Sequence, residues 1–144
     1  MEGKALLFKR FANINAIDIE VKAKNADEFV DTVERIADTF GGINLEDIKA
    51  PECFEIEQRL ITQCTIPVFH DDQHGTAIVT AAGLLNVLKI QGKAPGNVKI
   101  VCLGAEAAAY ACMNLLCALG LQREQIVMVD RLGVIYKQRP GLNQ

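Results

Sequence analysis

The stretch VKIVCLGAEAAAYACMNLLCALGLQREQIVMVD, residues 98–130, decides the fold of this chain. The apolar run at 98–103 predicts a strand, and residues 105–119 predict the helix that follows it. Residues 126–129 predict a second strand, which ends on Asp130. A strand, a helix and a further strand in this order are typical of a parallel sheet with a crossover helix. The sequence therefore predicts an α/β fold that contains a βαβ unit.

The residues before this stretch predict further strands and helices, separated from it by a linker. The linker QGKAPG at 91–96 is the candidate boundary between two domains, predicted at 1–93 and 94–144. Strands are predicted at Ala5–Phe8, Ile14–Val21, Ile43–Leu45 and Ile66–Phe69. Helices are predicted at 26–39 with Asn25 as the N-cap, from Pro51 to about 63, and at 76–88.

Length, charge and cysteine content exclude several classes of protein. The 144 residues suffice for one ordinary domain or for parts of two. The net charge of −3, with lysine and arginine dispersed along the chain, argues against a nucleic-acid partner. The start MEGKALLFKRFA lacks the apolar core of a signal peptide, and no uncharged apolar run reaches the ~18 residues of a membrane span. The five cysteines form no CxxC pair and are typical of free thiols, so we expect a cytoplasmic protein without a membrane partner.

Two acidic pairs, Glu46-Asp47 and Asp71-Asp72, each follow a short apolar run and precede helix-like sequence. This position predicts that they lie at strand ends facing a crevice. Carboxylates from two separate loops can converge on Mg²⁺ or Mn²⁺, which prefer oxygen ligands. Zinc fits less well, because the chain has only two histidines and no cysteine pair with zinc-site spacing. Acidic pairs at helix starts are also common as caps or as solvated charge, and the spacing alone leaves both interpretations open.

Three segments resemble bacterial malic enzymes. GGINLEDIKAPECFEIE at 41–57 and IPVFHDDQHGTAIV at 66–79 are similar to two signature segments of that family, and MEGKALLFKRFA at 1–12 resembles the segment that precedes them. The resemblance extends over 1–139. It implies part of a metal and substrate domain, followed by the first βαβ unit of a Rossmann-like dinucleotide-binding domain. It also implies malate and pyruvate as substrate and product, Mg²⁺ or Mn²⁺, NAD or NADP, and a homo-oligomeric parent enzyme.

The resemblance assigns roles to particular side chains of the first domain. Glu46, Asp47 and Asp72 match the three metal carboxylates, and Asp71 matches a neighbour that is not a ligand. Lys4 resembles the family's general-base lysine, which must be neutral to accept the hydroxyl proton of malate. Without the resemblance, this residue would be interpreted as a solvated lysine near the start of the chain. His70 and His74 have no matching metal or base role and are predicted to make structural hydrogen bonds.

The predicted dinucleotide turn departs from the family pattern at one position. It begins Gly104-Ala105-Glu106, and the family has glycine where Glu106 stands. A side chain there obstructs the close approach of a pyrophosphate, and its carboxylate repels phosphate. Gly104 and Ala105 remain candidate nucleotide contacts. We therefore expect Glu106 to weaken nucleotide binding at these two residues.

Two further positions are candidates for nucleotide binding. Asp130, at the end of the second predicted strand, would hydrogen-bond the adenosine ribose of NAD, or it is an acidic residue of the turn that ends the strand. The next residue, Arg131, could instead receive the 2′-phosphate of NADP, so NAD is favoured only slightly. Thr76 matches a nucleotide contact of the family, although it could equally cap the helix that follows it.

These expectations lead to one main functional hypothesis and to two alternatives. The chain is interpreted as a segment of a malic enzyme that is inactive in isolation, because family groups that bind malate and donate a proton match no residue here. A first alternative is a non-catalytic remnant that associates with intact malic-enzyme subunits or with itself through uncovered apolar surface. A second is a metal-dependent enzyme for another 2-hydroxy acid, which would leave the βαβ unit unexplained.

Overall fold

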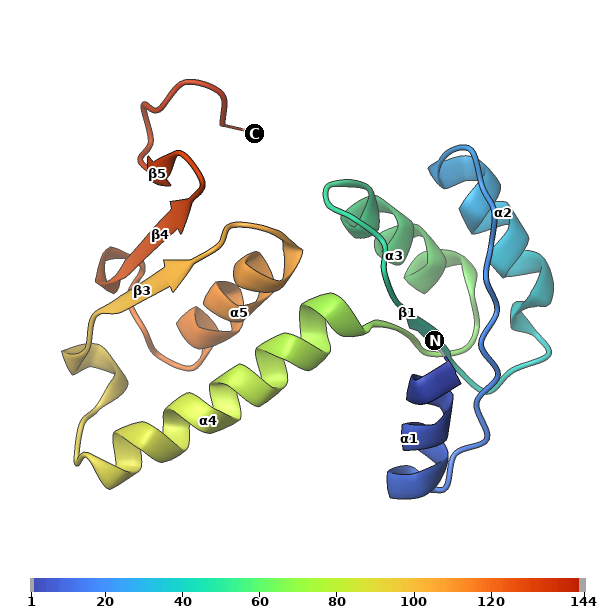
Figure 1. Ribbon diagram of the computed structural model, residues 1–144, viewed down its shortest axis with the longest axis horizontal. Helices are drawn as coiled ribbons and strands as arrows, with labels where there is room; N and C mark the ends of the chain where they lie inside the picture. The colour runs from blue at the N-terminus through green and yellow to red at the C-terminus, as the bar shows by residue number, and fades with distance from the viewer. Residues whose placement is uncertain (1, 143–144) are drawn as a thin grey trace.

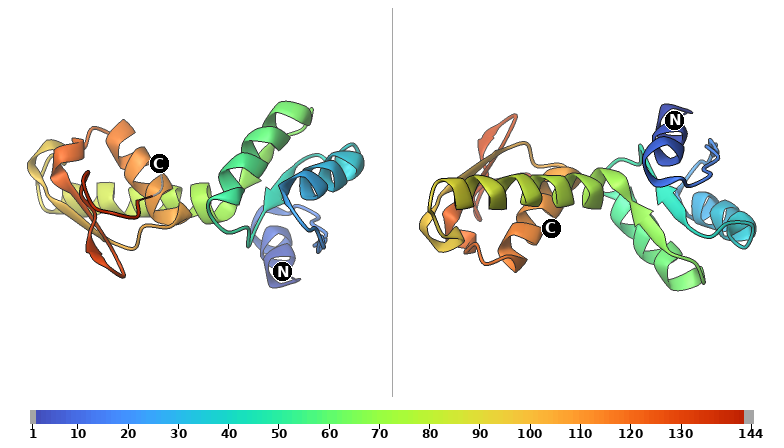
Figure 2. Two further views of the ribbon diagram at one scale, coloured as in Figure 1. Left: turned by 90° about the horizontal axis from the view of Figure 1, so that it is seen from above. Right: turned by 90° about the horizontal axis from the view of Figure 1, so that it is seen from below.

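The computed structural model describes residues 2–142, which form two lobes with separate hydrophobic cores (Figures 1 and 2). Met1, Asn143 and Gln144, which the predicted domains include, lie outside the described residues. The first lobe holds α1 (Glu2–Ala12), α2 (Ala26–Ala37), β1 (Ile43–Leu45), α3 (Glu52–Gln63) and β2 (Val68–His70). A π-turn, η1 (Asp71–Gly75), leads into α4 (Thr76–Ile90) and the second lobe. That lobe continues with η2 (Pro95–Asn97), β3 (Ile100–Leu103), α5 (Ala107–Ala118), η3 (Arg123–Gln125), β4 (Ile126–Asp130) and β5 (Gly133–Val134).

The core of the first lobe lies between α2, α3 and a short parallel pair of strands. Strands β1 and β2 pair in parallel, with Ile43 opposite Val68 and Leu45 opposite His70. The helix α2 begins as predicted, because the Asn25 side chain accepts a hydrogen bond from the Glu28 backbone N–H at 2.9 Å. Apolar side chains from the two helices and β1 are buried together: Val30, Val33, Leu45, Ile56 and Leu60.

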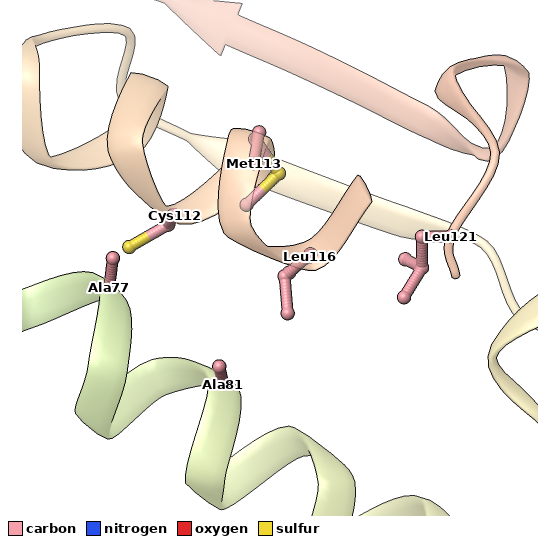
Figure 3. Close-up of a cluster of buried hydrophobic side chains, with 6 residues drawn as sticks. All are labelled: Ala77, Ala81, Cys112, Met113, Leu116 and Leu121. Carbon is pink, nitrogen blue, oxygen red and sulfur yellow. The ribbon is translucent and has the colours of Figure 1, made fainter. Parts of the chain in front are cut away.

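The second lobe is the predicted βαβ unit, and it confirms the α/β fold class. Strands β3 and β4 pair in parallel, α5 connects them, and β5 turns back antiparallel to β4. Helix α5 packs between the sheet and α4, and small residues on α4 allow the two helices to approach closely (Figure 3). The buried cluster consists of Ala77, Ala81, Cys112, Met113, Leu116 and Leu121. Because α4 belongs to this core, the predicted boundary after Lys93 separates α4 from the helix that it contacts, and that boundary stays a prediction.

Two predicted strands in the first lobe were wrong. Residues Ala5–Phe8 lie within α1, and Ile14–Val21 form neither helix nor strand. The segment KALLFK consists of good helix formers, and helix forms where no neighbouring strand is available to pair. The alternating residues Ile14, Ile17 and Ile19 are all at least half exposed, so the pattern has no buried face to fix it as a strand.

The sheet of the second lobe is covered on one face. Ile100 and Cys102 point toward α5 and the core, whereas Val101 and Leu103 are 62% and 83% exposed. Parallel sheets are normally buried on both faces, which is why their strands are apolar throughout. The described residues therefore leave an apolar sheet face open.

Among residues 2–142, no helix is both long and apolar enough to span a membrane.

Candidate active site

The pairing of β1 with β2 brings the two acidic pairs together. Because the strands are parallel and Leu45 lies opposite His70, the residues that follow them leave the sheet side by side. These residues are Glu46 and Asp71, each the first member of its acidic pair. The predicted placement at the carboxyl ends of the strands is confirmed.

Three of the four carboxylates form a compact cluster. One oxygen from each of Glu46, Asp47 and Asp72 lies within 4.8 Å of the others. The Asp47 backbone N–H donates to Oδ2 of Asp72 at 2.9 Å and ties the two loops together. Asp47 has a φ of 57°, a left-handed conformation that aspartate tolerates better than most residues and that is common at functional sites. A set of three converging carboxylates fits Mg²⁺ or Mn²⁺, since both prefer oxygen ligands.

Lys4 of α1 reaches the same cluster from the start of the chain. Its Nζ donates to Oε2 of Glu46 and, at 2.6 Å, to Oδ2 of Asp71. Partial burial opposes the charged amine, but the hydrogen bonds and the attraction of Asp71 and Glu46 outweigh it, so the pKa of Lys4 is raised. With these partners Lys4 is a charged hydrogen-bond donor, opposite to the neutral state that a base requires.

A buried glutamate that the sequence analysis missed organises the loop behind the cluster. Glu57 of α3 is 7% exposed and accepts from the His70 backbone N–H at 3.1 Å and from Nε2 of Gln73 at 3.2 Å. Its Oε1 also lies 2.7 Å from Nε2 of His74. The signal was present in the sequence, because Glu57 falls on the helix face shared by Cys53 and Leu60, both fully buried.

The two histidines therefore differ in their outcomes. His74 makes the predicted structural hydrogen bond, through its ring nitrogen to Glu57. His70 is fully buried and only its backbone bonds to that glutamate, whereas its ring nitrogens have no partner among residues 2–142. The prediction of a side-chain hydrogen bond was therefore correct for His74 and wrong for His70.

The predicted nucleotide turn lies at the carboxyl ends of β3 and β4. Gly104 has a φ of 122°, which favours glycine, and its N–H donates to the Val129 carbonyl at 2.7 Å. Ala105 follows in the turn, and Glu106 occupies the N-cap position of α5 without a capping hydrogen bond from its side chain. Glu106 therefore places a negatively charged residue at the helix end that would otherwise attract a phosphate.

Thr76 and Asp130 complete the predicted set of nucleotide contacts. Thr76 is the first residue of α4, and the N-cap of that helix is Gly75, so the capping alternative for Thr76 was wrong. Asp130 ends β4 beside the Gly104 turn, and its carboxylate is held by the guanidinium of Arg139, with Nη1 at 2.9 Å from Oδ1. Hydrogen bonding to Arg139 lowers the pKa of Asp130. The sequence analysis did not identify Arg139, which lies nine residues later in an irregular segment.

The site residues thus form two groups on two sheets. Lys4 and the three clustered carboxylates gather at the end of the β1–β2 pair, whereas Gly104, Ala105 and Asp130 gather at the end of β3 and β4. Helix α4 begins directly after the acidic loop η1 and packs on α5, so it links the first group to the second lobe (Figure 1).

Comparisons with known proteins agree with this arrangement. Residues 1–61 match the model of the malic enzyme N-terminal domain, and residues 73–144 match that of the malic enzyme NAD binding domain. The chain is 67% identical over its whole length to the NADP-dependent malic enzyme of Halomonas elongata, of which it spans 34%. It is 58% identical to the NAD-dependent malic enzyme of Rhizobium meliloti over 99% of the chain and 18% of that protein. The crystal structure of the NAD-dependent malic enzyme from Thermotoga maritima superimposes with a TM-score of 0.89 and 46% identity, over 96% of this chain and 36% of the other.

The chain spans about a third or less of the length of these curated relatives. The two family models match residues in both lobes, and the similarity to the Halomonas elongata enzyme extends over the whole chain. The chain therefore belongs to the malic enzyme family.

Proposed function

We propose that this chain supplies the metal carboxylates and the proton-accepting lysine of a malic enzyme. Such an enzyme oxidises malate with NAD or NADP and decarboxylates the product to pyruvate. The observation that carries the proposal is the meeting of Lys4 with Glu46, Asp47 and Asp72, from three separate segments of the chain, at one end of the β1–β2 pair.

Glu46, Asp47 and Asp72 would hold the divalent cation. When bound, Mg²⁺ or Mn²⁺ polarises the oxygens of malate and stabilises the negative charge that develops as CO₂ leaves. Asp71 stays outside this set, because its carboxylate does not belong to the cluster of converging oxygens. The two members of the second acidic pair would therefore have different tasks.

Lys4 would accept the hydroxyl proton of malate while hydride passes to the nicotinamide. The Lys4 side chain is 29% exposed, and its amine is oriented by two carboxylates, which support positioning but keep the amine charged. The lysine must therefore lose its proton before it can act as a base. Lysine can titrate in this way, whereas arginine cannot.

The nucleotide would bind at the carboxyl ends of β3 and β4, with contacts from Gly104, Ala105, Asp130 and Thr76. A carboxylate at the end of β4 suits the ribose of NAD, whereas the exposed Arg131 beside it suits the 2′-phosphate of NADP. NAD remains slightly favoured, because Asp130 is the residue nearer the turn. Glu106 opposes binding of either nucleotide.

Mn²⁺ binding to the chain tests the metal part of the proposal. We expect electron paramagnetic resonance to show one Mn²⁺ site. Asp72→Asn should lower the affinity of that site for Mn²⁺ at least tenfold, since one of three charged ligands is lost. Asp18→Asn makes the same chemical change at an exposed position and should leave the affinity unchanged. Equal affinities in the two variants would contradict the assigned ligands.

Turnover can be tested by grafting residues 1–144 into the Halomonas elongata relative in place of its matching segment. With Glu106→Gly to restore the turn, we expect malate-dependent formation of NADPH in the presence of Mn²⁺. Lys4→Ala in that graft should lower the rate at least ~100-fold, the usual loss for a general base. A graft that keeps its rate without Lys4 would refute the base assignment.

A second candidate function is association without catalysis, either with intact malic-enzyme subunits or between copies of this chain. The open sheet face of Val101 and Leu103 supports it, as does Glu106 in the nucleotide turn. Co-purification with the intact relative, or concentration-dependent self-association, would support this function. A monomer at all concentrations, with no retained partner, would count against it.

We also propose a cytoplasmic location. All five cysteines are free, and burial raises the pKa of the Cys53, Cys64 and Cys102 thiols, which makes them unreactive. Thiols in this state suit a reducing compartment.

A further inference from the structure

The carboxylate of Asp71 is held between Lys4 and Gly75. Its Oδ2 accepts from Nζ of Lys4 at 2.6 Å, and its other oxygen lies against the Cα of Gly75. A Cβ at Gly75 would lie 2.8 Å from Cγ of Asp71 and closer still to Oδ1, nearer than any side chain packs. Within the π-turn η1, the two residues are its first and its last.

The backbone of Gly75 does not itself require glycine. Its φ of −62° and ψ of −49° are right-handed helical values that every residue adopts. Because η1 runs directly into α4, Gly75 lies within a continuous helical stretch, and in a helix interior alanine is favoured over glycine by about 0.5–1 kcal/mol. The absence of a side chain at this position is therefore explained by the Asp71 carboxylate, not by backbone strain.

The contact between Gly75 and Asp71 also affects which carboxylates hold the Lys4 amine. Lys4 has two carboxylate partners, Glu46 and Asp71, but only Glu46 belongs to the metal cluster. A Cβ at Gly75 would displace the short Asp71 side chain, and Oδ2 would leave Lys4 with it. Lys4 would then depend on Glu46 alone, the carboxylate that a metal also needs.

We propose that Gly75 is a positioning residue for Lys4 and acts through Asp71. It leaves the space in which Asp71 can hold the lysine amine, so that Lys4 keeps a carboxylate partner when a metal takes Glu46. The proposal rests on the base role given to Lys4 under the proposed function, but the contact itself can be tested without turnover.

The test measures how fast Lys4 is acylated by a limiting amount of acetic anhydride at one fixed pH, by mass spectrometry of the 144-residue chain. We expect Gly75→Ala to raise the Lys4 rate about fivefold, since one charge-assisted hydrogen bond of a part-exposed lysine is lost. Lys49, whose side chain is 84% exposed, is the internal reference and should not change. Gly83→Ala is the matched control, because Gly83 lies exposed within α4 and a Cβ there meets nothing within 4 Å.

A double-mutant cycle with Asp71→Ala keeps the proposal falsifiable. The double variant has no carboxylate for the new methyl to displace, so it should fold and label Lys4 at the rate of Asp71→Ala alone. Additive effects of the two changes, or a Lys4 rate in Gly75→Ala equal to that in Gly83→Ala, would overturn the proposal. If the variants show the expected Lys4 labelling but the unchanged chain binds no Mn²⁺, or the graft shows no turnover, the result would instead count against the proposed function.

Discussion

At the scale of single residues, the buried Glu57 of α3 holds the acidic loop in place through hydrogen bonds, although it lies outside that loop. It collects donors from three residues of the segment 70–74, which contains both members of the second acidic pair. A carboxylate in a nearly buried position is stable only with such partners. The shape of the acidic loop therefore depends on a residue that is not itself a ligand.

We predict that Glu57→Ala lowers the free energy of unfolding by roughly 2–4 kcal/mol, because buried donors lose their charged acceptor. Glu55 lies two residues earlier on the exposed side of α3. Glu55→Ala removes only a surface ion pair with Arg59 and should cost less than ~1 kcal/mol. Urea unfolding followed by circular dichroism measures both values. Equal losses would show that the donors find other partners, and the central role of Glu57 would be abandoned.

The Asp130–Arg139 pair predicts a particular response to acid. Because the folded-state pKa of Asp130 lies below its ordinary value of 3.8, the pair stabilises the native state above that pH. This contribution is lost as the pH falls through the folded pKa. In an NMR titration of the side-chain carboxyl carbon, Arg139→Ala should return the pKa of Asp130 toward 3.8, whereas Arg131→Ala should shift it less. A larger effect of Arg131 would contradict the hydrogen-bonded pairing seen here.

At the scale of elements, the turn before α5 combines a helix N-terminus that favours phosphate binding with a glutamate side chain that opposes it. Glu106 sits at the N-cap, where backbone N–H groups would otherwise attract the phosphates of a dinucleotide. Two separable effects oppose binding: the negative charge, and the side chain at the position where the family has glycine.

Replacing Glu106 in two ways separates these effects. We predict that Glu106→Ala tightens nucleotide binding roughly threefold by removing the charge, and that Glu106→Gly tightens it more than tenfold by also removing Cβ. Fluorescence titration with NADH and NADPH measures both. If neither variant binds better than the unchanged chain, then the turn is not the limiting defect.

The elements also show what the sequence can and cannot predict. Helices α2 to α5 and strands β1 to β4 follow from apolar periodicity, because each has a buried face that produces the pattern. The segment Ile14–Val21 also alternates apolar and polar residues, but it pairs with no strand. An alternating sequence does not form a strand without a partner. The π-turn at Asp71–Gly75 is held by side chains from outside it, Glu57 of α3 and Lys4 of α1, so no local pattern reveals it.

The site residues divide along the same line. The acidic pairs are visible because charge beside a strand is unusual, and the metal interpretation became specific only through the family resemblance. Partners such as Arg139 are set by the path of an irregular segment, which sequence periodicity does not describe. The raised pKa of Lys4 likewise results from which carboxylates surround it, and that depends on tertiary structure.

At the scale of the whole molecule, the two lobes differ in how their apolar surface is arranged. The first lobe exposes apolar side chains on a helix and on the irregular segment after it, such as Phe11 of α1 and Ile17. The second lobe exposes neighbouring residues on one flat sheet face, Val101 and Leu103 on β3 beside Val127 on β4. A contiguous face of this kind attracts a matching surface more strongly than isolated residues do.

If copies of this chain associate, the open sheet face is therefore where they should meet. We predict that Val101→Lys weakens self-association at least tenfold, because a charge would have to be buried between two apolar faces. Ile17→Lys places the same charge at a more exposed position, 73% against 62%, but away from the sheet, and should change association little. Sedimentation velocity over a range of concentrations measures both. Equal weakening by the two lysines would mean that association is nonspecific, and the sheet face would then have no special part in it.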